Sequence, residues 1–438
     1  MTRSRIGIGI IGFGTVGSGV VKLLLHNRDV LARRVGIPLE LIKVADVDVT
    51  RDRGVTLPSG VLTANAGEVI AHPNVDVVVE LIGGIEPAKR FIVEAMARGK
   101  HVVTANKALL AAAGEELFAE AGARRVDFEF EAAVGGGIPI IRALKEGLSG
   151  NRIESIYGII NGTSNFILTK MTDERKAFAD VLAEAQRAGY AEADPTADVE
   201  GHDSANKLAI VVSLAFGTPV TLKEIYTEGI TGITPLDIEF AREFGYRIKL
   251  LAIAKAQDNA IEARVHPTMI PEENLLAQVG GVFNAIYVVG DFVGQTLFYG
   301  RGAGDQPTAS AVVSDLVAIA RNIRHGAAGR VPPASYDGPS RRPLRLLAME
   351  EIASLYYLRC SVVDNPGVLS TISGLLGKYN ISISAVIQKG RKAGGAVAVV
   401  MMTHRAIERD VRRALAEIDR LPSVVDKTVL IRVEGEGD

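Results

Sequence analysis

The chain has one cysteine, Cys360, and no tryptophan. A single cysteine cannot form an internal disulfide, and no cysteine–histidine cluster has the spacing of zinc ligands. The 49 basic and 51 acidic residues nearly balance, so neither nucleic acid nor a charged membrane surface is a favoured partner. The chain also lacks a signal peptide and any apolar run long enough to span a bilayer, so we expect a cytoplasmic protein.

What is present is enough for several folded units. A chain of 438 residues is too long for one core, so two to three domains are expected. Hydrophobic residues make up 47% of it, which is ordinary for a globular protein. The 46 glycines cluster in loops.

A glycine-rich turn follows the first expected strand, residues 5–11. Gly12, Gly14 and Gly17 fit the dinucleotide-binding pattern, and an apolar helical stripe follows them. Such a turn brings the backbone close to a pyrophosphate and presents the positive end of a helix to it. A second register that begins at Gly7 is rejected, because it would place the turn inside the strand.

The choice between NAD and NADP stays open at the next strand, residues 39–46. Its last residue, Asp46, could hold a ribose 2′-hydroxyl and favour NAD. Arg51 and Arg53 follow and could instead hold the 2′-phosphate of NADP. Asp46 lies further from the glycines than usual, so residues 27–38 are expected to be an insertion.

Two more strand–helix units follow. The first begins with a buried strand at VDVVVELIGG (75–84), and the stretches HVVTANKALL (101–110) and VDFEFEAAVGGGIPI (126–140) come after it. Thr104, Asn106 and Lys107 lie just past the carboxyl end of a strand, where open α/β sheets place ligands. Lys107 is either a ligand-binding lysine or a solvated one. Glu80, near the end of the first strand, is interpreted as a hydrogen-bonded carboxylate.

The stretch EAAVGGGIP (131–139) permits two interpretations. Three successive glycines free the backbone to curl after Glu131. One carboxylate with several converging carbonyl oxygens could hold a hard cation. A hinge between domains explains the same residues equally well.

The most informative stretch is AQRAGYAEADPTADVEGHDSANK (185–207). Its carboxylates are Glu192, Asp194, Asp198, Glu200 and Asp203. Asp203 and Lys207 are four residues apart at the start of an expected helix, so they share one face. Because apolar residues continue that face, the pair suits acid–base chemistry in a cleft. An exposed salt bridge is the alternative at even odds.

The final third begins with a linker rich in proline, glycine, serine and arginine. After it the pattern is βαββαβ, a ferredoxin-like unit without a nucleophile or general base. A ligand-sensing or dimerising role is therefore expected, and we expect activity to survive its removal. The expected parts are a Rossmann domain (1–135, with helix 306–324 returning to it), a substrate and dimerisation domain (136–324), a linker (325–348) and the tail (349–438).

Residues 185–207 resemble the homoserine dehydrogenase signature position for position. GFGTVG, TANK, EAAVGGGIP and NGTSNFIL resemble other blocks of that family in the same order, over residues 5 to about 325. The stretch SVVDNPGVLSTISGLLGKYNISI (361–383) resembles an ACT domain, an amino-acid-sensing module.

The resemblance implies the fold class: an α/β protein with an N-terminal Rossmann-type parallel sheet, an α+β catalytic and dimerisation domain, and a C-terminal ferredoxin-like ACT domain. It also implies hydride transfer between a nicotinamide cofactor, NADP or alternatively NAD, and the aspartate 4-semialdehyde/homoserine pair. Lys207 would donate the proton to the carbonyl oxygen. Asp203 would orient Lys207, and Lys107 would contact the cofactor and the reacting oxygen.

The remaining implied roles concern binding. Substrate would be bound by Glu192, Asp198, Asp203 and Gly189. Cofactor would be bound by Gly12, Phe13, Gly14, Thr15, Val16, Gly17, Thr104, Lys107, Gly189 and Gly302. A sodium ion would be held by Glu131 and by the carbonyls of Val134, Gly136 and Ile138.

The expected partners are the small-molecule substrate, an amino-acid effector such as threonine, and a second or further copy of the chain in a homodimer or homotetramer. The competing hypotheses are a non-catalytic sensor of nucleotide and amino acid, and a related semialdehyde reductase. An acylating semialdehyde dehydrogenase is disfavoured, because its cysteine nucleophile would have to be Cys360 in the tail.

Overall fold

The computed structural model describes residues 4–389 and 395–435. Contacts divide the chain into two compact units that interleave along the sequence. The first unit comprises Met1–Ile160, Asp203–Ile225 and Phe283–Leu344, and the second comprises Asn161–His202, Tyr226–Val282 and Arg345–Asp438. In the part of the chain that is described, no helix is long and apolar enough to cross a membrane.

The first unit contains a six-stranded parallel sheet in the order β3-β2-β1-β4-β5-β6. Its strands are β1 (Ile6–Ile11), β2 (Leu39–Ala45), β3 (Leu62–Thr63), β4 (Val77–Glu80), β5 (His101–Thr104) and β6 (Phe128–Glu129). This order reverses between β1 and β4, which is the point where doubly wound sheets bind dinucleotides. The strands are short apolar runs because both faces of the sheet are covered.

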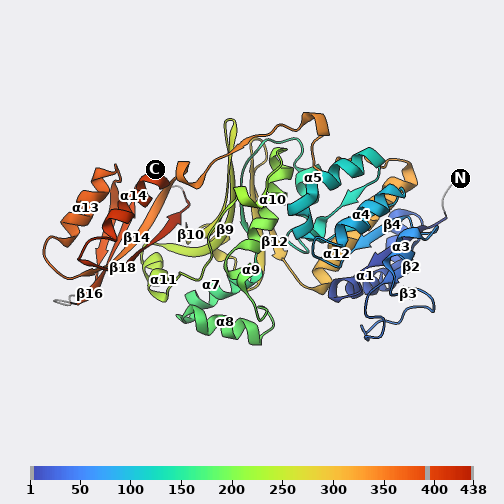
Figure 1. The fold of residues 1–438 in the computed structure, drawn as a ribbon, viewed down its shortest axis with the longest axis horizontal. Coiled ribbons are helices and arrows are strands. Elements are labelled where there is room, and N and C mark those ends of the chain that lie inside the picture. The colour runs from blue at the N-terminus through green and yellow to red at the C-terminus, as the bar shows by residue number, and fades with distance from the viewer. Residues whose placement is uncertain (1–3, 390–394, 436–438) are drawn as a thin grey trace. The chain divides into compact units, whose positions relative to one another are not determined.

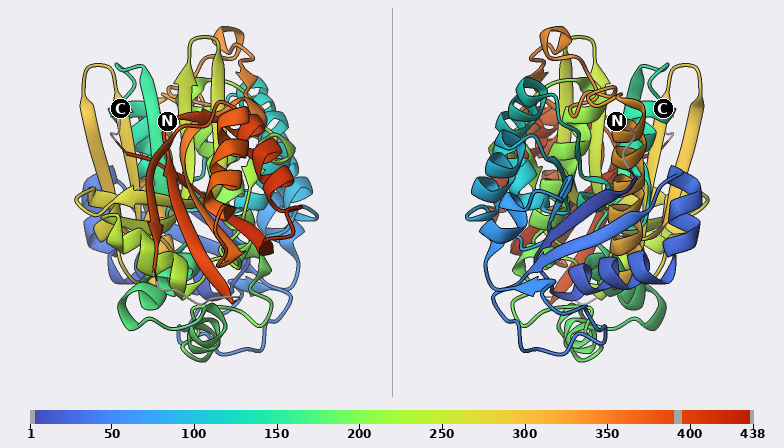
Figure 2. Two further views of the ribbon diagram at one scale, coloured as in Figure 1. Left: turned by 90° about the vertical axis from the view of Figure 1, so that its left-hand side faces the viewer. Right: turned by 90° about the vertical axis from the view of Figure 1, so that its right-hand side faces the viewer.

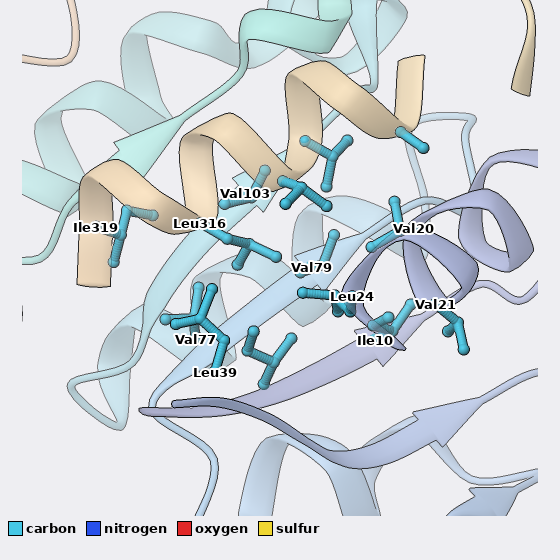
Figure 3. Packing of buried hydrophobic residues seen from close by; sticks show 14 of the residues in the cluster. Ile10, Val20, Val21, Leu24, Leu39, Val77, Val79, Val103, Leu316 and Ile319 are labelled. Atoms are coloured by element: carbon cyan, nitrogen blue, oxygen red, sulfur yellow. The ribbon is translucent and has the colours of Figure 1, made fainter. Parts of the chain in front are cut away.

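Helices cover the two faces of this sheet (Figures 1 and 2). They are α1 (Thr15–His26), α2 (Arg28–Val35) and α12 (Asp305–His325) on one face, and α3 (Ala66–Ala71), α4 (Ala88–Ala97) and α5 (Lys107–Arg124) on the other. Figure 3 shows the core of the first face, where Leu316 and Ile319 of α12 and Val20 and Leu24 of α1 belong to one buried cluster over the sheet. Helix α12 therefore belongs to this core although it follows the sheet strands by many residues.

The first unit continues with three strands and several helical segments. The strands are β7 (Ile153–Ile159), β11 (Phe283–Gly290) and β12 (Gly294–Arg301), paired antiparallel in the order β12-β11-β7. The helical segments are η1 (Glu131–Ala133), α6 (Ile140–Arg142), η2 (Ala143–Gly147), α10 (His202–Phe216) and η3 (Leu222–Glu224), with η5 (Gly338–Ser340) in the expected linker.

The second unit is built around an antiparallel hairpin, β9 (Tyr246–Gln257) and β10 (Ala260–Pro271). The other elements before the tail are α7 (Gly162–Glu174), α8 (Phe178–Arg187), α9 (Thr196–Val199), β8 (Tyr226–Thr227), α11 (Pro235–Glu243) and η4 (Leu275–Gln278). The short strand β8 pairs with β10 in parallel, at Tyr226 opposite Arg264.

The tail forms the predicted ferredoxin-like unit. Its elements are β13 (Arg345–Leu346), η6 (Met349–Glu351), β14 (Ala353–Val363), α13 (Val368–Lys378), β15 (Ile383–Gln388), β16 (Ala396–Thr403), β17 (Ala406–Ile407), α14 (Glu408–Ile418) and β18 (Val424–Val433). Helices α13 and α14 lie side by side on one face of its strands (Figures 1 and 2). The last strand, β18, also pairs in parallel with β10, at Arg432 opposite Thr268.

The predicted fold class is confirmed: a Rossmann-like parallel sheet, a mixed-sheet catalytic region and a ferredoxin-like tail. The tail belongs to the same compact unit as β9 and β10.

Candidate active site

The three glycines of the first turn have three different structural roles. A Cβ atom on Gly17 would lie 2.1 Å from the carbonyl oxygen of Gly12, so the turn closes only without one. Gly12 has φ +104°, a conformation that glycine adopts readily. A Cβ on Gly14 would meet nothing within 4 Å. The turn is thus tight inside and open at Gly14, which caps α1 and can face a phosphate.

Asp46 and Arg53 lie beside this turn and bind each other. The Asp46 carboxylate accepts the Phe13 N–H at 2.6 Å, and its other oxygen lies 3.1 Å from an Arg53 nitrogen. The Arg53 guanidinium also lies 5.0 Å from the centre of the Phe13 ring. The two groups that the sequence offers as alternatives for the ribose are therefore part of one cluster.

The side chains of Phe13, Thr15 and Val16 differ in exposure. Phe13 is buried, Thr15 is exposed and Val16 is half-buried. Gly302 is buried in another part of the first unit, where a Cβ would overlap the Asn284 amide.

The ends of β4 and β5 are joined by a buried hydrogen bond. Thr104 Oγ1 donates to Glu80 at 2.6 Å, and the other Glu80 oxygen accepts the N–H groups of Ile82 and Gly83. Glu80 is therefore the hydrogen-bonded carboxylate that the sequence suggests. Asn106 caps α5 by accepting the Leu109 N–H, which fixes the position of Lys107 at the start of that helix.

Asp203 lies between two lysines. One carboxylate oxygen is 2.6 Å from Lys207 Nζ and the other is 2.7 Å from Lys107 Nζ. Lys207 also donates to the carbonyl oxygen of Ile160 at 2.7 Å. The side chains of Lys207 and Asp203 are 9% and 8% exposed, whereas that of Lys107 is 43% exposed. The structure therefore brings the three predicted catalytic residues together in the first unit, and the Asp203–Lys207 pair is not a surface salt bridge.

The electrostatics of this cluster favour an anion beside it. Burial alone would raise the pKa of Asp203, but the ammonium groups of Lys207 and Lys107 outweigh it and hold that pKa well below its ordinary value. Two ammonium groups and one carboxylate leave one net positive charge, which suits an oxygen that gains negative charge during a reaction.

The Glu131 loop has a different buried network. The Glu131 carboxylate accepts the N–H groups of Ile141 and Arg142, both at 2.8 Å. Burial raises the pKa of Glu131 and those two hydrogen bonds oppose the rise. Asp315 of α12 accepts the Glu131 N–H at 2.9 Å, and burial raises its pKa well above the ordinary value.

The carbonyl-bearing part of this loop is tightly turned. Gly136 has φ +53°, and a Cβ there would lie 2.5 Å from the carbonyl oxygen of Gly302. Val134, Gly136 and Ile138 are all buried. The loop is therefore held on both sides rather than arranged as an open hinge.

The remaining predicted residues belong to the second unit, in the acidic loop, which we define as residues 189–201. Asp198 accepts a hydrogen bond from Asn161 at 2.7 Å, and its backbone carbonyl accepts one from Ser164. Glu192 is exposed. Gly189 has φ +74° and open space around its missing Cβ.

The sequence pattern did not identify two groups that take part in these networks. The carbonyl oxygen of Ile160 contacts Lys207 through the backbone, which leaves no signal in side-chain identity. Asp315 could have been found, because it is a single carboxylate on the apolar face of α12.

Comparisons with known proteins agree with this geometry. The chain matches the family model described as homoserine dehydrogenase over residues 139–317, its NAD-binding domain over residues 12–131, and the ACT domain over residues 356–423. It is 47% identical to a homoserine dehydrogenase of Neisseria gonorrhoeae, over 99% of each chain.

Solved structures that are similar to this chain are also homoserine dehydrogenases. A homoserine dehydrogenase from Thiobacillus denitrificans is 48% identical and has a TM-score of 0.93, with 99% of each chain covered. A hyperthermophilic archaeal homoserine dehydrogenase mutant in complex with NADPH is 27% identical and has a TM-score of 0.62, covering 72% of this chain and 97% of that one. Because these family models and full-length relatives match almost the entire chain at such identity, the chain belongs to the homoserine dehydrogenase family, as an oxidoreductase with an ACT domain.

Proposed function

We propose that the protein catalyses the reversible, NADPH-dependent reduction of L-aspartate 4-semialdehyde to L-homoserine in the cytoplasm, as a step of threonine, methionine and isoleucine biosynthesis. The observation that carries the proposal is the buried Asp203 carboxylate held between Lys107 and Lys207. Reduction of an aldehyde requires a hydride and a proton, and negative charge develops on the oxygen between the two transfers.

The surroundings of the three residues support the roles proposed for them. Lys207 is held by Asp203 and by the Ile160 carbonyl, so its ammonium group has a fixed position from which to donate a proton. Lys107 has one side in solvent and supplies a second positive charge to the oxygen and the cofactor. Asp203 orients both lysines and contacts the substrate.

The acidic loop is proposed to bind the amino-acid end of the substrate. Glu192 is exposed and available to an ammonium or hydroxyl group, and Asp198 supports the loop through Asn161. Gly189, with open space at its missing Cβ, allows substrate or cofactor to approach the backbone.

For the cofactor, we propose NADP in preference to NAD. Gly12, Gly14 and Gly17 form the pyrophosphate turn, and Phe13, Thr15 and Val16 line it, with Thr104, Lys107 and Gly302 as further contacts. Arg51 and Arg53 supply positive charge for a 2′-phosphate, and Arg53 is already anchored by Asp46. The archaeal neighbour in complex with NADPH supports a nicotinamide cofactor.

The Glu131 loop is proposed to hold a sodium ion through Glu131 and the carbonyls of Val134, Gly136 and Ile138. A buried carboxylate together with backbone carbonyls is a donor set for a hard cation. Each Glu131 oxygen accepts one N–H group and keeps a second lone pair. The ion would brace the loop; it has no part in the proton transfer proposed above. We expect the melting temperature to rise more with sodium chloride than with choline chloride, and Glu131→Gln to remove the difference.

We further propose a homodimer, or a homotetramer that includes it. Aromatic and apolar side chains share one face of β7, β11 and β12: Tyr157, Phe283, Tyr287, Leu297 and Tyr299. Tyr299 is 56% exposed and Leu297 is 36% exposed in the single chain, and such a face is typical of subunit contact. Light scattering should give at least twice the chain mass, and Tyr299→Lys should lower it.

The decisive experiment is homoserine oxidation with NADP⁺ and with NAD⁺, each with and without L-threonine. Turnover that is faster with NADP⁺ and inhibited by threonine would support the reaction, the cofactor and an effector role for the tail. Binding of NADPH without homoserine-dependent turnover would reject the proposal in favour of a sensor of nucleotide and amino acid.

A further inference from the structure

A short segment of the second unit, residues 226–232, links the tail to the acidic loop. We call it the bridging segment. Its backbone is bonded to the loop, because the Ile230 N–H donates to the Val199 carbonyl at 2.8 Å. Thr231 Oγ1 also donates to the Glu200 carboxylate at 3.0 Å.

The bridging segment and the acidic loop are closely packed. A Cβ on Gly229 would lie 2.4 Å from the Val199 carbonyl oxygen. A Cβ on Gly201 would lie 3.1 Å from the Thr227 methyl group. A displacement of the bridging segment must therefore move the end of the acidic loop.

The other side of the bridging segment is held by the tail. Glu228 accepts Arg432 Nη1 at 2.9 Å and the Tyr226 hydroxyl at 2.7 Å. Arg432 also donates to Tyr226 Oη at 3.2 Å, and its guanidinium lies 5.0 Å from the centre of that ring. Arg432 belongs to β18, the last strand of the tail.

Arg432 is unusually well fixed. Its side chain is 1% exposed and forms two hydrogen bonds with Glu408, which is also 1% exposed. A buried ion pair of this kind is a poor source of stability compared with apolar side chains of the same size, but it can specify one arrangement. Here it fixes where the tail holds Glu228.

We infer that the Arg432–Glu228 ion pair positions the acidic loop for its substrate, so that Arg432 of the tail is a positioning residue for the reaction. The inference rests on the proposed role of the acidic loop in binding the amino-acid end of the substrate. A ligand that shifts β18 would therefore move Arg432 and Glu228, and through them change the affinity of the acidic loop for the substrate.

The chain offers a matched pair of variants. Glu417, in the tail, also accepts a tyrosine hydroxyl and a cationic side chain, from Tyr379 and Lys378. The side chains of Glu228 and Glu417 are 35% and 33% exposed. Glu228→Gln and Glu417→Gln thus make the same chemical change at side chains of similar exposure. The cationic partner is buried for Glu228 and exposed for Glu417, and of the two only Glu228 is linked to the acidic loop.

The experiment is steady-state kinetics of homoserine oxidation on the full-length wild type and both variants. For Glu228→Gln we expect the KM for homoserine to rise about tenfold, equivalent to about 1.4 kcal/mol. Its kcat, its KM for NADP⁺ and its melting temperature should stay close to those of Glu417→Gln. Thr231→Val should raise the same KM, and the double variant should show less than the product of the two effects, because both act on one segment.

Three other outcomes would count against the inference. If the wild type is active and the two variants have the same KM for homoserine, the inference is wrong while the proposed function stands. A parallel loss of kcat, both KM values and melting temperature in Glu228→Gln would assign Glu228 a merely structural role. An inactive wild type would overturn the proposed function and this inference with it.

Discussion

At the scale of single residues, the two active-site lysines differ in their surroundings. Lys207 is enclosed and bonded to Asp203 and a backbone carbonyl, whereas Lys107 is nearly half exposed. A fixed, enclosed ammonium is suited to directed proton donation, and an exposed one is suited to following a cofactor as it enters and leaves. This difference assigns them different kinetic effects.

Lys207→Ala is expected to lower kcat by about 10²- to 10⁴-fold, the usual contribution of a positioned general acid. Affinity for NADP⁺ should barely change, because Lys207 bonds to Asp203 and Ile160 rather than to the glycine turn. Stopped-flow turnover and fluorescence titration of NADPH would measure the two quantities. Lys89→Ala, which removes an ion pair with Glu116 on the helical surface, is the control. An equal loss of turnover and cofactor affinity would identify Lys207 as structural.

A third lysine is buried away from this site. Lys249 is 4% exposed and donates to the Val279 carbonyl at 2.6 Å and to Asn165 at 3.2 Å. Burial lowers its pKa to about 8. Folding therefore works against its charge, while the unfolded chain keeps the ordinary value near 10.4.

This pKa gives a pH dependence of defined sign. Below pH 8 both states bind the proton; between about 8 and 10.4 only the unfolded state does, so stability rises with pH. Relative to Lys249→Met, the wild type should gain about 2 kcal/mol of unfolding free energy from pH 8 to pH 10. Urea unfolding at both pH values measures the difference. A constant difference between the two proteins would mean that Lys249 keeps its charge in the fold.

The positions of several candidate site residues could be predicted from the sequence. Local pattern placed Asp203 and Lys207 on one face at a helix start and Lys107 just past a strand end, but left their roles open. The predicted catalytic roles came from the family resemblance. The contact of Lys207 with Ile160 could not be predicted, since a carbonyl oxygen belongs to every residue. The ion pair between Asp46 and Arg53 could not be predicted either, because the sequence pattern indicates each residue only as a ligand for the cofactor.

At the scale of elements, the glycine turn combines two separable requirements. Gly17 must lack a Cβ so that the turn can close, while Gly14 has open space beside it and an ordinary backbone conformation. Closure of the turn and access of a phosphate are therefore controlled by different residues.

Gly17→Ala and Gly14→Ala should consequently fail in different ways. The added methyl at position 17 overlaps the Gly12 carbonyl, so we expect a loss of about 1–3 kcal/mol of stability in the cofactor-free protein. At position 14 stability should be nearly unchanged, but the methyl faces the bound pyrophosphate and the KM for NADP⁺ should rise. Thermal melting without cofactor and initial-rate kinetics would separate the two effects. A stability loss of the same size in both variants would contradict this division.

Element boundaries were predictable where hydrophobic runs are clear, as in β1, α1 and β5. They were not predictable at residues 126–140, where apolar and acidic residues alternate and then run into three glycines. The chain makes only the short strand Phe128–Glu129 there and then turns at η1. The buried Glu131 carboxylate holds the start of α6, and this tertiary contact outweighs the strand preference of the neighbouring residues.

At the scale of the whole molecule, the order of residues along the chain does not follow its compact units. Each unit collects three separate segments of sequence. The expected division into domains, including the return of helix 306–324 to the first of them, remains a prediction. Helix α12 packs in the core of the first unit.

The tail changes one expectation. The sequence suggests that the chain can lose everything after residue 345 and stay active. In the structure, Arg359 of the tail binds the fully buried Asp237 at 2.6 Å, and Glu434 binds Lys255 and the buried Arg264. Removal of the tail would break these ion pairs, and loss of one partner from a buried ion pair costs several kcal/mol.

We therefore expect the chain truncated after residue 345 to be largely insoluble, or to melt well below the full-length protein. Expression, solubility and calorimetry of the two forms would test this. Full-length protein carrying Lys378→Ala, an exposed change in the tail, is the control for a local effect. A soluble truncated form with wild-type turnover would show that the tail is dispensable after all.

The pairing of β10 with β18 also bears on how the chain is made. Thr268 leaves the ribosome long before Arg432, its neighbour in the finished sheet, and at usual synthesis rates the interval is about ten seconds. During that time β10 has an open edge at Thr268 and Met269, the residues that pair with β18, and such an edge is the kind of surface on which nascent chains aggregate. The earlier strand β8 can already pair with β10 at Arg264 and Val265. Strand β10 also carries Glu262 and Arg264, which are buried in the folded chain. On the unfinished chain such charged side chains disfavour pairing with other strands.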